Sequence, residues 1–279
     1  MPRKAIFILL FCLIMLPLVP ACADAYIALD GKVLDWQGGV WLEGKCMVPV
    51  RPIFQELGYK LTSDMEQGVV QANKGQEKIV IHLWQPKVLH NGSEFSGAGI
   101  PQLIEGRTML YAEDLSRLLG LTLSQEPASN AISFFTKPEM TQEGIVGHLF
   151  TADRMYLRAE YYNNQDFLIE HHVAPSPVLV TKYDLEQLLG NYWSPVYIDR
   201  LWQDGSEQGR YVGFYSEGSI PLSYSKEIFV SEITPTGARV EVTMPDWWEE
   251  DLNNLYKLIY TLSLDEQGRL VITDLKYLE

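Results

Sequence analysis

The sequence predicts an α+β fold: a duplicated small α/β module followed by an α+β domain with helices packed on a curved antiparallel sheet. Two observations support this prediction. Within the first half, a set of anchor residues recurs 62 positions later, as from Gly44 to Gly106 and from Gly58 to Gly120. In the second half, helical periodicity comes first and alternating strand patterns follow, which is the order of an α+β domain.

The recurring segment of the first half reads as strand, turn, strand, helix, strand. Both copies contain a Glu-Gly turn followed by a basic residue, then an apolar strand, then a helix that stops at Gly58 or Gly120. A repeat that keeps one register without a gap indicates duplication of one supersecondary unit. We expect copies at residues 25–83 and 87–136 that share a core, because each is too small to bury its apolar face alone.

The first copy contains Glu43-Gly44-Lys45, then Met47-Val48-Pro49-Val50-Arg51, then a helix that ends at Leu57-Gly58. This pattern resembles the copper amine oxidase N-terminal-like module, also called the stalk domain, which is common in secreted Gram-positive proteins. The second copy departs from it, because Tyr111-Ala112-Glu113 replaces the Pro-x-Arg segment. The resemblance implies a spacing or binding domain at residues 24–137 that carries no copper site.

The first 23 residues have the composition of a secretory signal peptide. A basic start precedes an apolar run over residues 5–19, and Ala21-Cys22-Ala23 offers small residues for cleavage. We expect cleavage after Ala23 and a mature protein that is secreted or associated with the cell wall. One alternative is a lipoprotein with lipid on Cys22. Another is a membrane anchor, which the short, proline-interrupted run disfavours.

The net charge limits the possible partners, and the cysteine content limits disulfide bonding. The chain has a formal net charge of −14 at pH 7, and such a chain repels nucleic acid and anionic lipid surfaces. We therefore expect no nucleic-acid partner, and no membrane span after signal cleavage. Of the three cysteines only Cys46 would remain after cleavage, so no internal disulfide could form. Cys46 is expected to be a small buried hydrophobe rather than a nucleophile.

The second half is expected to begin with a linker over residues 138–147, followed by the α+β domain over residues 148–279. Thr181 is expected to cap a helix with Asp184 as its partner in a capping box. Two further helices are expected over 154–162 and 196–202. The strands are expected over residues 209–215, 226–233, 238–244, 255–264 and 270–277, on the basis of alternation between turns.

This order of elements resembles the NTF2-like and cystatin-like group, in which a curved sheet wraps helices to form a cone. The segment Val180–Leu189 ahead of a strand meander also resembles the IseA-type inhibitors of cell-wall DL-endopeptidases. The first resemblance implies a cone-shaped pocket, and the second implies inhibition of a wall hydrolase.

Metal and serine chemistry find little support in the sequence. His171-His172, with Asp166 and Glu170 nearby, could suggest a metal, but adjacent histidines point in different directions and a tetrahedral site needs convergent ligands. We expect a solvated loop there, and no metal or cofactor. No Gly-x-Ser-x-Gly nucleophile motif occurs in the chain.

The candidate binding site is the tryptophan pair at a strand-to-strand connection, together with its acidic neighbours. Two adjacent tryptophans in an extended segment cannot both point into one core, so one is expected to stack on sugar rings or to anchor a partner protein. The alternatives are core packing for the tryptophans and a helix start for the acids. The predicted site residues are Trp247, Trp248, Asp246, Glu249 and Glu250.

These observations predict a secreted, non-catalytic envelope protein that binds a cell-wall polymer or a wall-associated protein. In one version it inhibits a peptidoglycan hydrolase by covering the cleft of that enzyme with acidic and aromatic residues. The alternative is a hydrolytic enzyme or a small-ligand binder that uses a cone-shaped pocket in the C-terminal domain. That alternative predicts a concave site with convergent polar groups and perturbed acids.

Overall fold

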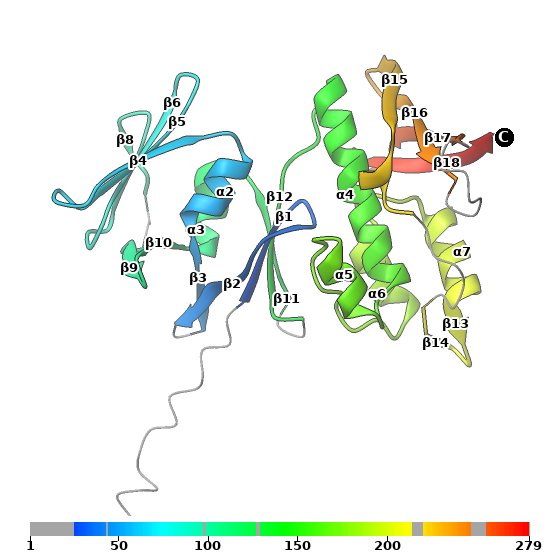
Figure 1. The fold of residues 1–279 in the computed structure, drawn as a ribbon, viewed down its shortest axis with the longest axis horizontal. Coiled ribbons are helices and arrows are strands. Elements are labelled where there is room, and N and C mark those ends of the chain that lie inside the picture. Colours follow the sequence, from blue (N-terminus) through cyan, green and yellow to red (C-terminus); the bar gives the residue numbers. More distant parts are fainter. Residues whose placement is uncertain are drawn as a thin grey trace, which may run out of the picture.

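The computed structural model describes residues 25–42, 44–96, 99–126, 129–213, 220–246 and 255–278. The expected signal peptide, with Cys22, lies outside these residues, and so does Glu43. Two parts lie side by side in Figure 1, where β1 and β12 of the first part face α4 and α5 of the second. Helices and mainly antiparallel sheets are mixed in the chain, which confirms the predicted α+β class.

The first part holds two sheets and two helices. One sheet has seven strands in the order β11-β12-β1-β2-β3-β10-β9, and the other has five in the order β4-β5-β6-β7-β8. The elements are β1 (Ala25–Leu29), β2 (Lys32–Leu42), β3 (Lys45–Pro49), α2 (Val50–Glu56), β4 (Lys60–Asp64), β5 (Val69–Lys74), β6 (Glu77–His82), β7 (Lys87–His90), β8 (Ser93–Glu94), β9 (Gln102–Ile104), β10 (Arg107–Tyr111), α3 (Ala112–Leu119), β11 (Thr122–Glu126) and β12 (Ala131–Phe135).

The two copies of the repeat meet at the antiparallel pair β3 and β10. Val48 lies opposite Leu110, its own counterpart 62 positions later, so a local twofold axis passes between them. The strands then cross over: β1 of the first copy pairs in parallel with β12 of the second, and β7 of the second pairs with β6 of the first. The expected shared core is confirmed, because one buried cluster contains both Ile53 and its counterpart Leu115.

Apolar side chains on β3 and on the two helices fill this shared core. Cys46 is fully buried there, as predicted, and burial raises the pKa of its thiol to about 12. Helix α3 ends at Gly120, which has a left-handed backbone and donates its N–H to the carbonyl of Ser116. The sequence pattern therefore identified the elements and their caps correctly in this region.

The second part places helices before an antiparallel meander. Strands β15 to β18 follow one another in chain order, as predicted, whereas the strand expected over residues 209–215 is described only as Arg210–Tyr211. The elements are α4 (Gln142–Glu160), α5 (Gln165–Glu170), α6 (Lys182–Leu189), α7 (Pro195–Gly205), β13 (Ser206–Glu207), β14 (Arg210–Tyr211), the 3-10 helix η1 (Leu222–Tyr224), β15 (Glu227–Thr234), β16 (Gly237–Pro245), β17 (Leu255–Leu264) and β18 (Leu270–Leu278).

Helix α4 begins earlier than the sequence suggested, at Gln142 inside the segment expected to be a linker. Thr141 caps it by accepting a hydrogen bond from the Gly144 N–H, and Ile145 and Leu149 begin its buried stripe. In the sequence Gly144 favours a loop. The structure explains the glycine differently, because a β-carbon at this position would collide with the backbone of Glu139.

The predicted capping box of α6 is present. The Thr181 side chain accepts from the Asp184 N–H, and the Asp184 carboxylate accepts from the Thr181 N–H at 2.7 Å. We expect Thr181→Ala to lower the free energy of unfolding by about 1 kcal/mol, because an N–H at the helix start loses its acceptor. Urea unfolding would measure it, with the exposed turn residue Thr236→Ala as a control that changes stability by less than about 0.5 kcal/mol. Equal effects of the two variants would contradict the role of the cap.

Backbone hydrogen bonds fasten the β1–β2 turn to the second part. Val33 donates its N–H to the carbonyl of His172, and Ala174 donates to the carbonyl of Gly31, each at 2.9 Å. The Arg154 guanidinium on α4 also donates to a backbone carbonyl of this turn, that of Asp30, at 2.9 Å. The two parts therefore dock through the backbone as well as through side chains.

A buried arginine forms the second link between the parts. Arg158 on α4 has no solvent exposure, and it donates from Nε at 3.0 Å and from Nη2 at 2.6 Å to the carbonyl of Pro175. Its Nη2 also pairs with the carboxylate of Glu126 at the end of β11. One guanidinium thus joins the edge strand of the first part to the helical layer of the second.

The β1–β2 turn gives a prediction that separates the effect of packing on stability from the effect of backbone strain. Gly31 and Gly44 both have positive φ, of 74° and 80°. A β-carbon at Gly31 would lie 2.6 Å from Met155 Cε, whereas at Gly44 no described atom lies within 4 Å. Both alanine variants should lose about 1 kcal/mol through strain, and Gly31→Ala about 1 kcal/mol more through overpacking, because Met155 Cε can move but Arg154 Cβ, 3.0 Å away, is held by the helix backbone. Equal losses in urea unfolding would show that Gly31 is not a packing point between the parts.

Candidate ligand-binding pocket

The site predicted from the sequence begins where β16 ends. Asp246 follows that strand and is half-buried. Its charge is one cause, after burial and the charge of Tyr277, of the raised pKa of Tyr256. The rest of the predicted set, Trp247, Trp248, Glu249 and Glu250, lies outside the described residues. Their role as a binding site therefore stays a prediction.

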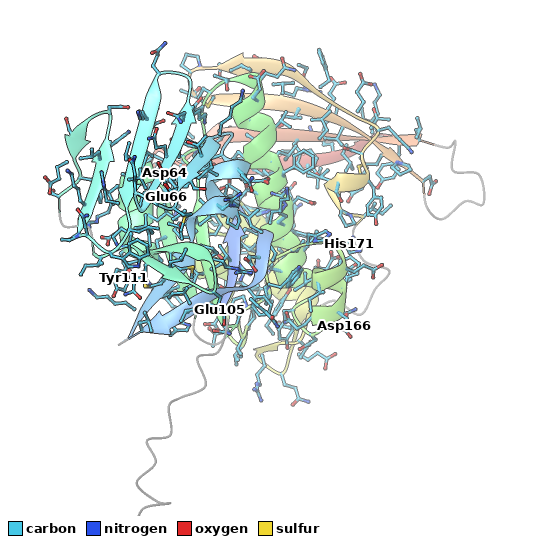
Figure 2. The ribbon with its side chains drawn as sticks, turned by 60° about the vertical axis from the view of Figure 1, so that its left-hand side comes forward. Asp64, Glu66, Glu105, Tyr111, Asp166 and His171 are labelled. Atoms are coloured by element: carbon cyan, nitrogen blue, oxygen red, sulfur yellow. The ribbon has the colours of Figure 1, made fainter. Side chains whose placement is uncertain are left out.

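The histidine pair lies at the contact between the two parts. Figure 2 labels His171 and Asp166 in the α5 region, and the His171 ring packs 4.2 Å from the ring of Phe167. His172 is exposed but lies 6.4 Å from Trp36 of β2. Asp166 and Glu170 lie on helix α5 and both histidines make aromatic contacts, so the expectation of a solvated loop is wrong in part. Within the described ranges no three His, Cys, Asp or Glu side chains are grouped to hold a metal ion.

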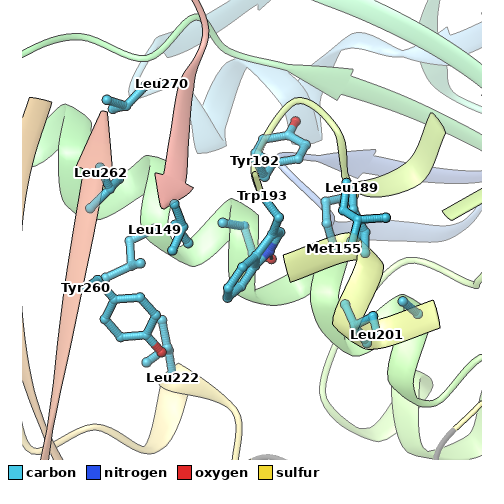
Figure 3. Close-up of a cluster of buried hydrophobic side chains, with 14 of the residues drawn as sticks. Leu149, Met155, Leu189, Tyr192, Trp193, Leu201, Leu222, Tyr260, Leu262 and Leu270 are labelled. Atoms are coloured by element: carbon cyan, nitrogen blue, oxygen red, sulfur yellow. Dashed lines mark hydrogen bonds between the residues drawn. The ribbon is translucent and has the colours of Figure 1, made fainter. Parts of the chain in front are cut away.

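A pocket of about 350 Å³ lies between α4, α7 and strands β17 and β18. Its walls are mainly aromatic, with Tyr156 from α4, Trp193 from the turn before α7, Tyr197 from α7 and Tyr260 from β17. Trp193 and Tyr260 belong to the packed core of this part, seen in Figure 3. The walls are therefore held by the same packing that holds the fold, which suits a preformed site.

Asp153 brings a carboxyl group to this aromatic pocket. It lies on α4 beside the buried residues Leu149 and Ala152, and its Oδ2 accepts a hydrogen bond from the Leu222 N–H at 3.1 Å. Burial raises the pKa of the Asp153 carboxyl to about 7, although the hydrogen bond from Leu222 and the nearby charge of Arg154 act in the opposite direction. Near neutral pH this group therefore exists in both protonation states.

Hydrogen bonds inside the fold fix two of the aromatic walls. The Trp193 indole N–H donates to the Ala152 carbonyl at 3.0 Å, and its ring centre lies 5.2 Å from that of Tyr156. The Tyr197 hydroxyl accepts from the Leu275 N–H at 2.6 Å. The indole N–H is occupied by the protein and the Tyr197 oxygen is held in place, so these walls offer a ligand mainly their rings and the Tyr197 O–H.

Tyr260 lies close to the buried acid. Burial is the main cause that raises the pKa of its phenol well above the usual value, and the charge of Asp153 is the next. Towards solvent the pocket is lined by Arg200 and Asp204 of α7 and by Tyr277 of β18, all exposed. The Arg200 guanidinium lies 5.1 Å from the centre of the Tyr197 ring.

The lining combines ionisable groups with aromatic surface. The described lining contains no Ser, Thr, Cys, His or Lys; its polar groups are two carboxyls, four phenols, one indole and one guanidinium. It offers aromatic surface, a desolvated carboxyl and a charged mouth, which are the ingredients of a ligand site.

The residues that line this pocket are not among the binding residues predicted from the sequence. Asp153 was missed because the helix is expected to start at Arg154, one residue too late to include it. The available signal was a single acid between Leu149, Ala152 and Tyr156, at helical spacing on an apolar stripe.

The first part is a duplicated module of crossed strands and two short helices, with no described metal-ligand group. Residues 29–134 match the family model of the copper amine oxidase N-terminal domain. This match confirms the resemblance noted in the sequence and indicates a stalk-like, non-catalytic domain. No curated protein and no solved structure matches the chain. Among the described residues no helix has the length and apolar character needed to cross a membrane.

Proposed function

We propose that this is a non-catalytic binding protein of the cell envelope, in which the N-terminal stalk-like domain carries a ligand-binding C-terminal domain. The observation that carries the proposal is the aromatic pocket with Asp153 in its lining. The small-ligand alternative drawn from the sequence required such a concave site with a perturbed acid. We therefore prefer the pocket between α4 and α7 to residues 246–250 as the ligand-binding site.

The envelope location rests on the sequence. The basic start, short apolar run and small residues of positions 1–23 favour export, and the net charge of −14 favours solubility in the wall. A two-part architecture with a docked interface suits a protein that presents its pocket at a fixed orientation. A wall fragment or another small envelope compound is thus the expected ligand.

The test uses the mature chain, residues 24–279, mixed with a soluble digest of purified peptidoglycan and separated by equilibrium dialysis. Mass spectrometry of the retained compounds should show a bound fragment whose mass does not change with time. Tyr277→Ala at the pocket mouth should reduce retention. Phe229→Ala, which removes another exposed aromatic on β15, should leave it unchanged. A change in the mass of the bound compound would favour an enzyme instead.

Inhibition of a peptidoglycan hydrolase remains a second form of the proposal, based on the acidic and aromatic segment from Asp246 to Glu250. It predicts that excess protein slows digestion of purified wall by a DL-endopeptidase. The double variant Trp247→Ala/Trp248→Ala should restore the rate. Undiminished digestion by the enzyme in the presence of the unaltered protein would remove this form of the proposal.

A further inference from the structure

The charges around the Asp153 pocket select against an anionic ligand. The lining holds two acids, Asp153 and Asp204, and one base, Arg200. Arg200 already lies over the Tyr197 ring, at the exposed end of the pocket. An anion that entered more deeply would meet the Asp153 carboxyl without a facing cation. An anion is therefore disfavoured by repulsion as well as by loss of hydration.

The aromatic walls favour positive charge. The face of an aromatic ring carries negative potential, and a cation within about 6 Å of a ring centre is attracted to it. Arg200, 5.1 Å from the centre of the Tyr197 ring, shows that this wall already accepts one cation in this way. Tyr156, Trp193 and Tyr260 extend the aromatic surface inwards from that point.

Asp153 adds a need for a counter-charge. Its carboxyl is desolvated, and the hydrogen bond given to it by the described residues comes from the Leu222 N–H. A carboxylate that is only partly exposed and has one neutral donor is costly, and a cation held against it removes much of that cost. A neutral ligand such as a sugar would leave the charge uncompensated.

We propose that the pocket binds an organic cation, a protonated amine or quaternary ammonium group, held among the aromatic rings and against the Asp153 carboxylate. This inference rests on the proposed function of the pocket as a ligand site. It adds the chemical class of the ligand and the residue that recognises its charge.

The proposal predicts a definite pH dependence. The groups that act on Asp153 are Arg154 and Glu160 of its own helix and Tyr260 of β17, while Arg200 and Asp204 of α7 line the same pocket. The pKa of Tyr260 lies above its usual range, so this phenol stays neutral at physiological pH. A cation binds the ionised form of Asp153, and affinity should therefore rise with pH up to about 7 and level off above it.

Isothermal titration calorimetry of the mature chain tests this with defined probes. Tetramethylammonium and n-butylammonium are the cations, and butyrate and N-acetylglucosamine are the anionic and neutral comparisons. Both cations should bind more tightly than either comparison. Their affinity at pH 8 should exceed that at pH 5.5 by about tenfold or more, since Asp153 ionises between these values.

Asp153→Asn is the central variant, because its amide oxygen can still accept from the Leu222 N–H while the charge is lost. Cation affinity should fall about tenfold or more at pH 8, and the pH dependence should disappear. Asp166→Asn, which removes an exposed acid on α5, should change neither. Unchanged cation binding in Asp153→Asn would overturn the assignment to this carboxylate.

The outcomes separate the ligand class from the site itself. Tight binding of N-acetylglucosamine or butyrate instead of the cations, sensitive to Tyr277→Ala, would overturn the cation class and leave the pocket as a ligand site. Failure of every probe to bind, with no fragment retained in the dialysis experiment, would overturn both proposals. Cation binding that is lost in Asp153→Asn and retained in Asp166→Asn would support both.

Discussion

Replacing Arg158 by methionine is expected to lower the free energy of unfolding by about 3 to 5 kcal/mol. The guanidinium is fully buried and bonds to both the Glu126 carboxylate and the Pro175 carbonyl. Methionine fills a similar volume but offers no donor. The Pro175 carbonyl then loses its donor. The largely buried Glu126 carboxylate loses its cationic partner and keeps hydrogen bonds from Ser124 and Ser129. The loss falls on the contact between the two parts, so we expect their unfolding to separate as well.

Urea unfolding followed by circular dichroism and by tryptophan fluorescence would measure both effects. The matched control is Lys32→Met, which removes an ion pair to Glu56 that is exposed on both sides. It should cost less than about 1 kcal/mol, because exposed pairs are well screened. A loss for Arg158→Met no larger than that of the control would show that the buried pair does not hold the parts together.

Asp153→Asn is expected to raise the free energy of unfolding at pH 8 by about 2 to 4 kcal/mol. The carboxyl pKa is 3.8 in its ordinary state and about 7 in the folded protein, with burial as the main cause. Between these values the unfolded chain releases a proton that the folded chain keeps. Stability therefore falls as pH rises from about 4 to about 7, and the penalty is constant above that range.

The variant removes this penalty, so its advantage should be full at pH 8 and should vanish near pH 3.5, where both states are protonated. Urea unfolding at the two pH values would show it, with Asp166→Asn changing stability by less than about 1 kcal/mol at either. No gain at pH 8 would mean that water reaches the carboxyl freely. A group that destabilises its own fold at neutral pH is characteristic of a functional site, where residues that serve binding lower the stability of the fold.

The sequence predicted those features that depend on local spacing. The strand–turn–strand–helix unit, the capping box at Thr181 and the meander from β15 to β18 all follow from residue patterns within a few positions. The sequence predicts a helix over only 154–162 in the region of α4, because Gly144 and Gly147 favour a loop. In the fold, Thr141 starts the helix and packing supports it. Tertiary contacts outweighed local propensity at this point.

Features that depend on long-range pairing were not predictable in the same way. A repeat shows that two segments are alike, but it does not show that β1 pairs with β12 or that β7 pairs with β6. Nor does the local pattern separate the fully buried Arg158 from the partly exposed Arg154 of the same helix. The cone shape implied by the resemblance stays a prediction, and the acid of the pocket between α4 and α7 was missed because it lies one residue before the expected helix start.

The exchange of strands about the Val48–Leu110 axis bears on how this domain arose. Each sheet takes strands from both copies, so one copy alone would leave both sheets incomplete. Tandem joining of two strand-swapped subunits would produce this arrangement, with the former subunit interface as the hydrophobic core. By the same logic, a chain cleaved between β6 and β7 should persist as a non-covalent complex of two fragments, each completing the other.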